Sequence, residues 1–447
     1  MASGLSRRYF FMGSAAALAA TQLEAKSRPS LKRAGYKSPN EKLNIAAVGA
    51  GGKGHSDITG CATENIVAFA DPDWKTAAKT FSEFPNAKRY KDYREMFDKE
   101  SNNIDAVIVA TPDHTHAPAA MWAMERGKHV YCQKPLTHTV YEARMLTEAA
   151  RKYGVATQMG NQGHSGEGTR KLCEMIWNGD IGTVKEVHAW TNRPIWPQGI
   201  DHPLPEQPIP ETMDWDLWLG TAATRPHNTG YYPFNWRGWY DFGCGALGDM
   251  ACHILDSVNW ALMLDAPVSV ECVKIEGKNP YTFPTKSVVK FEFAARANMP
   301  AVNVFWYEGG LRPPVPDGLP ADVKLGDIGD PSNGSLFIGS KGFITTGTYG
   351  DGTRLIPDEL MKEYKFPAKL LTRSPGHYRD WIRACKGGDP ACSNFNYAGP
   401  FTEWVALGVI AQRSEGKLLW DSKKMKITNN SEANKFVKPY VRKGWKF

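Results

Sequence analysis

The chain of 447 residues lacks paired cysteines. Its eight cysteines form no Cys-x-x-Cys pair and none of the spacings of a zinc finger. Neither a thiol redox motif nor a structural zinc site is therefore predicted, and we expect no bound metal ion. Several cysteines lie in apolar runs, as in Tyr131-Cys132-Gln133, which is typical of buried free thiols. Free thiols fit folding in a reducing compartment.

The chain also lacks an internal repeat, a low-complexity block and a long apolar segment. No apolar stretch is long enough to span a membrane, so we expect no stable membrane anchor. The net charge of +7 is spread along the chain, and its densest basic run, Lys26 to Lys42, lies in an N-terminal leader. This distribution predicts no nucleic-acid partner. A hydrophobic content of 42% is ordinary for a globular protein, and the length suits two or three domains.

The N-terminus resembles a twin-arginine export signal. Arg7 and Arg8 precede a short run of small apolar residues, 13–20. This signal predicts a protein exported to the periplasm or beyond, with residues 1–42 as signal and linker. A twin-arginine route moves folded proteins, so a cofactor bound in the cytoplasm can travel with the chain. The alternative is a disordered basic tail.

A glycine-rich turn follows a short apolar strand and precedes a lone aspartate. The strand is expected at 43–48, the turn reads Gly-Ala-Gly-Gly-Lys-Gly, and Asp71 follows the apolar run 66–70. This is the Gly-x-Gly-x-x-Gly pattern in the context that dinucleotide sites require, namely a strand, a helix start and a later acid. The alternative is a glycine-rich surface turn in another α/β protein. The pattern predicts a dinucleotide site at four glycines: Gly49, Gly51, Gly52 and Gly54.

Asp71 indicates which dinucleotide is bound. A carboxylate at this strand end accepts hydrogen bonds from a ribose 2′-hydroxyl and repels a 2′-phosphate. No arginine follows it, and Lys75 is the only nearby cation. NAD is therefore favoured over NADP, and a solvated strand-end acid is the alternative.

The pattern along the chain predicts two structural parts. Strands and helices alternate from residue 43 to about 165, as in a Rossmann dinucleotide-binding domain. Residues 166–447 are expected to form an α+β domain with an open, mostly antiparallel sheet, interrupted by Pro-rich loops at 194–235 and 309–334. Strands are predicted at 43–48, 66–70, 105–110, 129–132, 155–159, 184–190, 268–275, 287–293 and 301–307, and helices at about 116–126, 140–153, 166–178 and 401–415.

Three polar stretches carry the candidate chemistry. Two follow predicted strands at 105–110 and 129–132, where α/β sheets bind ligands. The third holds Asp249 and His253, which are four residues apart and share one face of a helix expected to begin near Ala246. A histidine can take the proton of a reacting hydroxyl, and Lys134 can stabilise the forming alkoxide. Taken singly, the lysine could be a surface cation, and the acid–histidine pair a cap and packing pair or two metal ligands.

Together these stretches resemble the Gfo/Idh/MocA family of sugar and inositol oxidoreductases, from about Leu43 to Ile410. The resemblance implies that Lys134 is the catalytic lysine, Asp249 the substrate-positioning acid and His253 the proton-transferring residue. It also implies a second domain that often mediates dimers or tetramers, so we expect a homo-oligomer. Gln133 stands where the family usually has Glu. Other residues expected beside the cofactor are Thr111, Pro112, His116 and Gln162.

Tryptophan and arginine gather in two segments that we expect to contact the substrate. Aromatic faces stack on the C–H bonds of a sugar ring, and guanidinium groups donate hydrogen bonds to its hydroxyls. A Trp-rich structural loop is the alternative for each segment. The predicted substrate-binding residues are Arg193, Trp196, Trp236 and Arg237.

The sequence therefore predicts an exported NAD-dependent oxidoreductase that acts on a secondary hydroxyl of a sugar or glycoside, with oxidation at C3 as one specific case. A redox-neutral glycoside hydrolase, which oxidises its substrate transiently and then eliminates the aglycone, uses the same residues. The retained Lys134 favours net oxidation. A non-catalytic NAD-binding or sugar-binding protein is the third reading, and the intact lysine–acid–histidine set argues against it.

Overall fold

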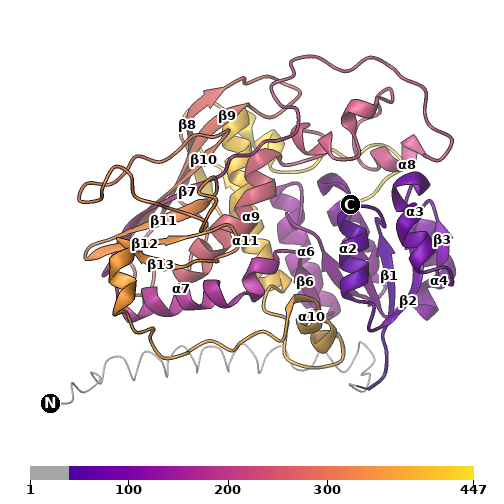
Figure 1. Cartoon of the computed structure of the whole chain (residues 1–447). Helices are drawn as coiled ribbons and strands as arrows, with labels where there is room; N and C mark the ends of the chain where they lie inside the picture. Colours follow the sequence, from indigo (N-terminus) through magenta and orange to yellow (C-terminus); the bar gives the residue numbers. More distant parts are fainter. Residues whose placement is uncertain (1–39) are drawn as a thin grey trace.

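The computed structural model describes residues 40–447, which contain two β-sheets with helices packed between and around them (Figure 1). The predicted signal in residues 1–39 lies outside the described residues. The predicted fold class, a Rossmann sheet followed by an α+β part with a mostly antiparallel sheet, is confirmed.

The first sheet has six strands, all parallel, in the order β3-β2-β1-β4-β5-β6. Five of them match the predicted strands, and the sixth, β3, was not predicted. The central strands β4 and β5 are wholly buried, which is why they read as short apolar runs. The strands are β1 (Asn44–Val48), β2 (Asn65–Ala70), β3 (Lys88–Tyr90), β4 (Ala106–Val109), β5 (His129–Cys132) and β6 (Thr157–Met159).

The helices of this part begin and end at residues that the sequence marks. Helix α6 (Val140–Tyr153) starts with a capping box between Thr139 and Glu142 and ends at Gly154, whose φ of 64° is left-handed. Its bounds and those of α5 (His116–Glu125) agree with the prediction to within one residue. The remaining helices here are α2 (Lys53–Gly60), α3 (Trp74–Glu83) and α4 (Tyr93–Glu100).

The second sheet has nine strands in the order β13-β12-β11-β7-β10-β9-β8-β14-β15. All neighbouring pairs are antiparallel except β7 and β10. Four strands match the prediction, and the last five were not predicted. The strands are β7 (Val184–Trp190), β8 (Ser269–Glu276), β9 (Lys286–Phe293), β10 (Val302–Glu308), β11 (Gly334–Gly339), β12 (Gly342–Thr346), β13 (Arg354–Ile356), β14 (Leu418–Asp421) and β15 (Lys426–Ile427).

Helices α9 and α11 lie between the two sheets, with α6 beside them (Figure 1). Helix α9 (Gly245–Ala261) begins where the prediction placed it. Helix α11 (Phe395–Arg413) begins six residues before the predicted start at 401, and Pro400 lies inside the helix, where it removes one backbone donor. Helix α7 (Glu167–Asn178) agrees with the prediction, and α10 (His377–Cys385) was not predicted.

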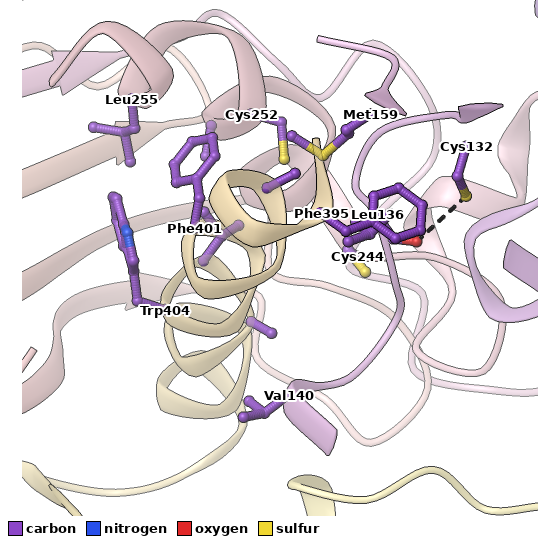
Figure 2. Close-up of a cluster of buried hydrophobic side chains, with 14 of the residues drawn as sticks. Cys132, Leu136, Val140, Met159, Cys244, Cys252, Leu255, Phe395, Phe401 and Trp404 are labelled. Atoms are coloured by element: carbon purple, nitrogen blue, oxygen red, sulfur yellow. Dashed lines mark hydrogen bonds between the residues drawn. The ribbon is translucent and has the colours of Figure 1, made fainter. Parts of the chain in front are cut away.

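A continuous hydrophobic core joins the two parts. Figure 2 shows Phe395, Phe401 and Trp404 of α11 beside Met159, Cys252 and Leu255, which come from β6 and α9. At the edge of this contact, Arg144 of α6 donates two hydrogen bonds, of 2.6 and 2.7 Å, to the Glu403 carboxylate. The first sheet is thereby fixed against α9, the helix that carries the predicted acid and histidine.

The two predicted loops are largely irregular. Residues 309–333 contain no helix or strand, and 194–235 contain only α8 (Trp215–Leu219) and single turns of 3₁₀ helix. Trp215 and Trp218 of α8 stack with ring centroids 4.8 Å apart inside a small aromatic cluster of this segment. All eight cysteines are free, and six of them are buried, as the sequence predicted.

Candidate active site

A cavity of about 600 Å³ opens where strands β1, β2, β4 and β5 end. Ligands of open α/β sheets bind in this place, outside the carboxyl ends of the strands. The opposite wall comes from residues 217–237, from Tyr349 and from Trp445 near the C-terminus. Most of the predicted site residues line this cavity: Gly49, Gly51, Gly52, Asp71, Thr111, Pro112, His116, Gln133, Lys134, Gln162, Trp236, Arg237 and His253.

The glycine loop has the geometry of a dinucleotide cradle. Gly49 has a φ of 86°, and a Cβ on it would lie 2.5 Å from the carbonyl oxygen of Ala110. A Cβ on Gly54 would lie 2.2 Å from the oxygen of Gly49, so Gly54 serves the packing of α2 and does not itself line the cavity. A Cβ on Gly52 would meet no atom within 4 Å, so space beside this residue is open to a ligand. The bare backbone and the N-terminus of α2 fit a pyrophosphate.

The Asp71 carboxylate is bound to the glycine loop. Its oxygens accept hydrogen bonds from the backbone amides of Ala50 at 2.8 Å, Gly51 at 3.3 Å and Asp73 at 2.9 Å. A carboxylate has about four acceptor positions, so one remains for a hydroxyl donor such as that of a ribose. Burial raises the pKa of Asp71 to about 6, against the effect of these three amides. The residue therefore shapes the loop as well as facing the cavity.

His116 ties together the two loops that follow β4 and β5. Its ring nitrogens lie 2.8 Å from the carbonyl oxygen of Pro135 and 2.9 Å from that of Thr111. Burial lowers the pKa of His116 to about 4, so the ring is neutral at neutral pH. The neutral ring has one N–H, so it donates to one of these two carbonyl oxygens and packs against the other, between Thr111 and the Gln133–Pro135 segment.

Lys134, Asp249 and Arg237 form one ionic network. The Lys134 ammonium donates to the backbone oxygen and to Oδ1 of Asp249, both at 2.8 Å, and Arg237 Nε donates to the same Oδ1 at 3.0 Å. Burial opposes ionisation of Asp249, but the two cations hold the pKa of its carboxyl well below the usual range. Asp249 is the fifth residue of α9, beyond the first turn, so these two cations are the main source of stabilisation for its charge.

His253 lies one turn further along α9 and lines the cavity. Burial, and next the positive charge of Lys134, hold the pKa of His253 well below its usual value. Its Nδ1 is buried and has no hydrogen-bond partner among the described residues, and its ring packs edge-on against Tyr349 at 4.9 Å. This shift favours the neutral imidazole, which carries one nitrogen lone pair.

Asp113 is a carboxylate in the cavity wall to which the sequence gave no role. Its Oδ2 accepts a hydrogen bond of 3.0 Å from the amide of Cys244, at the start of α9, and its buried Oδ1 has no partner among the described residues. Burial raises the pKa of Asp113 to about 7, although Arg237 and Lys134 act in the opposite direction. The only signal in the sequence was its place inside the stretch 111–116.

The predicted substrate-binding residues separate into two groups. Arg237 lies over the Trp236 ring at 4.2 Å, and both residues line the cavity. The Trp196 ring lies 5.9 Å from the Arg237 guanidinium. The Arg193 guanidinium donates a hydrogen bond of 2.9 Å to the side-chain oxygen of Asn192. Neither Trp196 nor Arg193 lines the cavity.

The C-terminal tail returns to the first sheet and completes the cavity. Arg442 bonds to the backbone oxygens of Gly220 and Asp216 beside α8. Trp445 lies 4.1 Å from the Arg94 guanidinium and lines the cavity. In Figure 1 the C-terminus is marked in the half of the molecule that holds the first sheet.

Residues 40–447 hold no group of three or more His, Cys, Asp or Glu side chains placed to bind a metal ion. None of their helices combines the length and apolar character of a membrane span.

Two curated relatives match parts of the chain. A levoglucosan dehydrogenase of Pseudarthrobacter phenanthrenivorans is 24% identical over 234 residues, which cover 49% of this chain and 51% of that protein. An inositol 2-dehydrogenase of Serratia proteamaculans is 29% identical over 158 residues, which cover 34% of this chain and 46% of that protein. The chain thus spans about half the length of these relatives.

Two solved structures share the fold over most of their length. The WlbA dehydrogenase from Bordetella pertussis, solved with NADH and UDP-GlcNAcA, aligns with a TM-score of 0.60 at 15% identity and covers 86% of this chain and 99% of that one. An inositol dehydrogenase homolog from Azotobacter vinelandii, solved with NADH and myo-inositol, aligns with a TM-score of 0.54 at 19% identity and covers 85% and 98%.

Family models match slightly more than half of the chain. The NAD-binding Rossmann fold of the oxidoreductase family matches residues 43–161, and the C-terminal alpha/beta domain of the same family matches residues 177–295. The chain therefore belongs to the Gfo/Idh/MocA oxidoreductase family, and its first sheet and glycine loop form that family's NAD-binding Rossmann fold.

Proposed function

We propose that the protein is an exported NAD-dependent oxidoreductase that oxidises a secondary hydroxyl of a sugar or glycoside, with C3 of a glycoside as one specific case. The observation that carries this proposal is the Lys134–Asp249–Arg237 network beside a neutral His253, in the same cavity as the glycine loop. The inositol and levoglucosan dehydrogenases among the relatives support a polyol or sugar substrate.

The side chains of the cavity suit removal of a hydroxyl proton. Bound NAD supplies the acceptor for a hydride. His253 takes the hydroxyl proton on a ring nitrogen, which its neutral state allows. Two hydrogens of the Lys134 ammonium are used by Asp249, so the third can donate to the substrate oxygen and stabilise negative charge that develops there. Asp249 holds this lysine in place.

The wall formed by Trp236 and Arg237 suits a polyhydroxylated ring. The indole offers an apolar face and the guanidinium offers donors to hydroxyl groups. Trp196 supports Arg237 from behind. We assign Trp236 and Arg237 to direct substrate contact, whereas Trp196 and Arg193 would reach the substrate only if the segment around 193–196 moves.

We also propose that Arg7 and Arg8 direct export by the twin-arginine route and that the chain assembles as a homo-oligomer. The export proposal rests on the paired arginines ahead of a short apolar run. The oligomer proposal rests on the family resemblance and on the wide second sheet.

Incubation with a panel of glycosides tests the activity. The purified protein is mixed with NAD and each glycoside, and NADH and released aglycone are measured together. Accumulation of NADH without aglycone supports net oxidation. Aglycone release without net NADH identifies the redox-neutral hydrolase, and binding of NAD with neither product identifies a non-catalytic protein.

Replacement of the proposed base tests the site. His253→Ala should lower the single-turnover rate roughly 10²–10⁴-fold with little change in NAD affinity, because a positioned acid–base group contributes about this much. The exposed His202 provides a matched control, and His202→Ala should leave the rate unchanged. A His253→Ala protein with the wild-type rate would place the chemistry elsewhere.

A further inference from the structure

Lys53 is a cavity residue that neither the glycine pattern nor the catalytic network explains. It is the first residue of α2, directly after Gly52, and lines the cavity. Its side chain is 42% exposed, whereas its ion-pair partner Asp57 is 0% exposed. The pair therefore turns its positive end toward the cavity and its negative end into the protein.

Asp57 is the centre of a buried hydrogen-bond network. Its carboxylate accepts hydrogen bonds from Lys53, from Tyr378 of α10 at 2.7 Å and from the side-chain amide of Gln133 at 2.7 Å. The Lys53 ammonium also donates to the Tyr378 hydroxyl at 3.2 Å. Burial raises the pKa of Asp57, and Lys53 is the leading influence that lowers it. We call Lys53, Asp57, Gln133 and Tyr378 the Asp57 network.

The Asp57 network gives a physical reason for an amide at position 133. Gln133 donates to Asp57 and accepts from the backbone amide of Lys134 at 3.2 Å, so it uses both halves of its side chain. A glutamate there would place a second carboxylate within hydrogen-bond distance of Asp57 in a buried site, which is strongly unfavourable. The carboxylate of this network therefore belongs to Asp57 of α2, which binds Lys53, and position 133 carries a neutral amide.

The position of Lys53 matches that of the cofactor's negative charge. The N-terminus of α2 and the bare glycine backbone form the place where a pyrophosphate binds. Lys53 is in the first turn of this helix and lines the same cavity, and its positive charge also lowers the pKa of the His253 ring. With the Gln162 amide turned so that its oxygen faces Tyr131, that oxygen also accepts a hydrogen bond from Lys53 at 3.3 Å. Asp57, Tyr378 and Gln162 thus hold the ammonium of a residue that lines the cavity.

We propose that Lys53 is a cofactor-binding residue that contacts the pyrophosphate of NAD, and that Asp57, Tyr378 and Gln133 hold its ammonium in place. The inference rests on the NAD-dependent function proposed above and concerns binding alone. A charge-assisted contact of this kind contributes affinity even before any reaction takes place. Because salt screens a charged contact, the affinity for NAD should fall more steeply with rising salt concentration than it would if only the backbone amides of the glycine loop bound the pyrophosphate.

Binding measurements without turnover test the proposal. Calorimetry of NAD, ADP-ribose and adenosine with Lys53→Met should show about tenfold weaker binding of NAD and ADP-ribose and unchanged binding of adenosine, because a hydrogen bond to a charged group contributes about this factor. The dependence of NAD affinity on salt should fall as well. The matched control is Lys79→Met, at an exposed lysine of α3, and should bind all three ligands as wild type does.

A second variant separates binding from folding. Lys53→Met leaves Asp57 buried without its cation, so Lys53→Met/Asp57→Asn removes both charges and should recover stability while binding NAD as weakly as Lys53→Met. NAD and ADP-ribose affinities within twofold of wild type in both variants would overturn the proposal. Equal losses for adenosine would also overturn it, because adenosine has no phosphate.

A charge exchange tests the support of Lys53. Gln133→Glu should weaken NAD binding and lower the thermal midpoint, because it sets two carboxylates together. Adding Asp57→Asn to Gln133→Glu should restore most of both losses, since one acid and one amide then face each other again. A double variant no better than the single one contradicts the proposed support. NAD affinity and the thermal midpoint are measured without a sugar. If the protein does not oxidise sugars, the proposed function fails but these measurements still test the role of Lys53.

Discussion

The buried carboxyl of Asp113 gives a prediction about stability and pH. Its pKa rises from 3.8 to about 7 in the folded protein, chiefly because of burial. Between these two values the native state keeps a proton that the unfolded state has released, so ionisation of Asp113 makes the protein less stable as the pH rises. At about 1.36 kcal/mol for each pH unit between the two pKa values, the full loss above pH 7 is about 4 kcal/mol.

The substitution Asp113→Asn removes this loss and keeps the contact with α9. The amide oxygen can still accept from the Cys244 backbone, which lies 3.0 Å from Asp113 Oδ2. About half of the loss is already present near pH 5.5, so the variant should gain about 2 kcal/mol over wild type between about pH 5.5 and about pH 8. Lys134 and Arg237 favour the charged form of Asp113, but the pKa of its carboxyl is raised to about 7 in spite of these two cations.

Urea unfolding at these two pH values measures the difference. Asp317→Asn, at an exposed acid of the 309–333 loop, serves as the control and should show no comparable gain. If Asp113→Asn changes stability equally at both pH values, Asp113 does not titrate in this range and its burial has been misread. A loss that grows with pH would mean that Lys134 and Arg237 outweigh burial.

Three further predictions concern the cofactor and export. Asp71→Ala should narrow the difference between NAD and NADP affinity measured by calorimetry, and wild-type protein that prefers NADP would contradict this reading of Asp71. Gly54→Ala should weaken NAD binding at least about tenfold, because the added Cβ would lie 2.2 Å from the Gly49 oxygen. The control is Gly127→Ala, whose Cβ would meet no atom within 4 Å; it should lower the free energy of unfolding by only about 1–2 kcal/mol, because of the positive φ at this residue. Replacing Arg7 and Arg8 with Lys should leave folded protein with its cofactor in the cytoplasm, which cell fractionation detects; unchanged export would remove the twin-arginine argument.

The Rossmann half was predictable because its signals are local. Buried parallel strands read as apolar runs, and Thr139 and Gly154 mark the ends of α6 within the sequence. Strand β3 was missed because Lys88–Tyr90 is short, lies at the sheet edge and has no buried residue. Its pairing depends on β2, which no local pattern in its own three residues reveals.

The second half was less predictable for the same reason. Strand β13 has three residues and β15 has two, so periodicity cannot distinguish them from loops. Helix α11 starts before the predicted residue 401 although Pro400 lies inside it, and tertiary packing supports the added turn: the Thr147 hydroxyl of α6 donates to the Phe395 carbonyl at 3.2 Å. Tertiary contacts between residues far apart in the sequence can thus outweigh the helix-breaking tendency of a single proline.

The site was predictable where spacing or family resemblance carried information. The spacing of Asp249 and His253 predicts that they share one face of a helix. The family resemblance predicts that Lys134 acts together with them. The contact of Lys134 with Asp249 joins residues 115 positions apart, which no local pattern encodes. Lys53 and Asp113 were left without roles because burial and the partners at α9 and α10 give them their significance.

The C-terminal tail sets a limit on when the cofactor site can exist. The cavity begins at Val48 and Gly49 and includes Trp445, which can reach it only after all the residues between them have been synthesised. At about 5–20 residues per second, a ribosome needs roughly 20–80 s to make the intervening residues. The cavity wall of the nascent Rossmann part therefore stays incomplete until Trp445 has been made, and loading of NAD into the complete cavity follows that step.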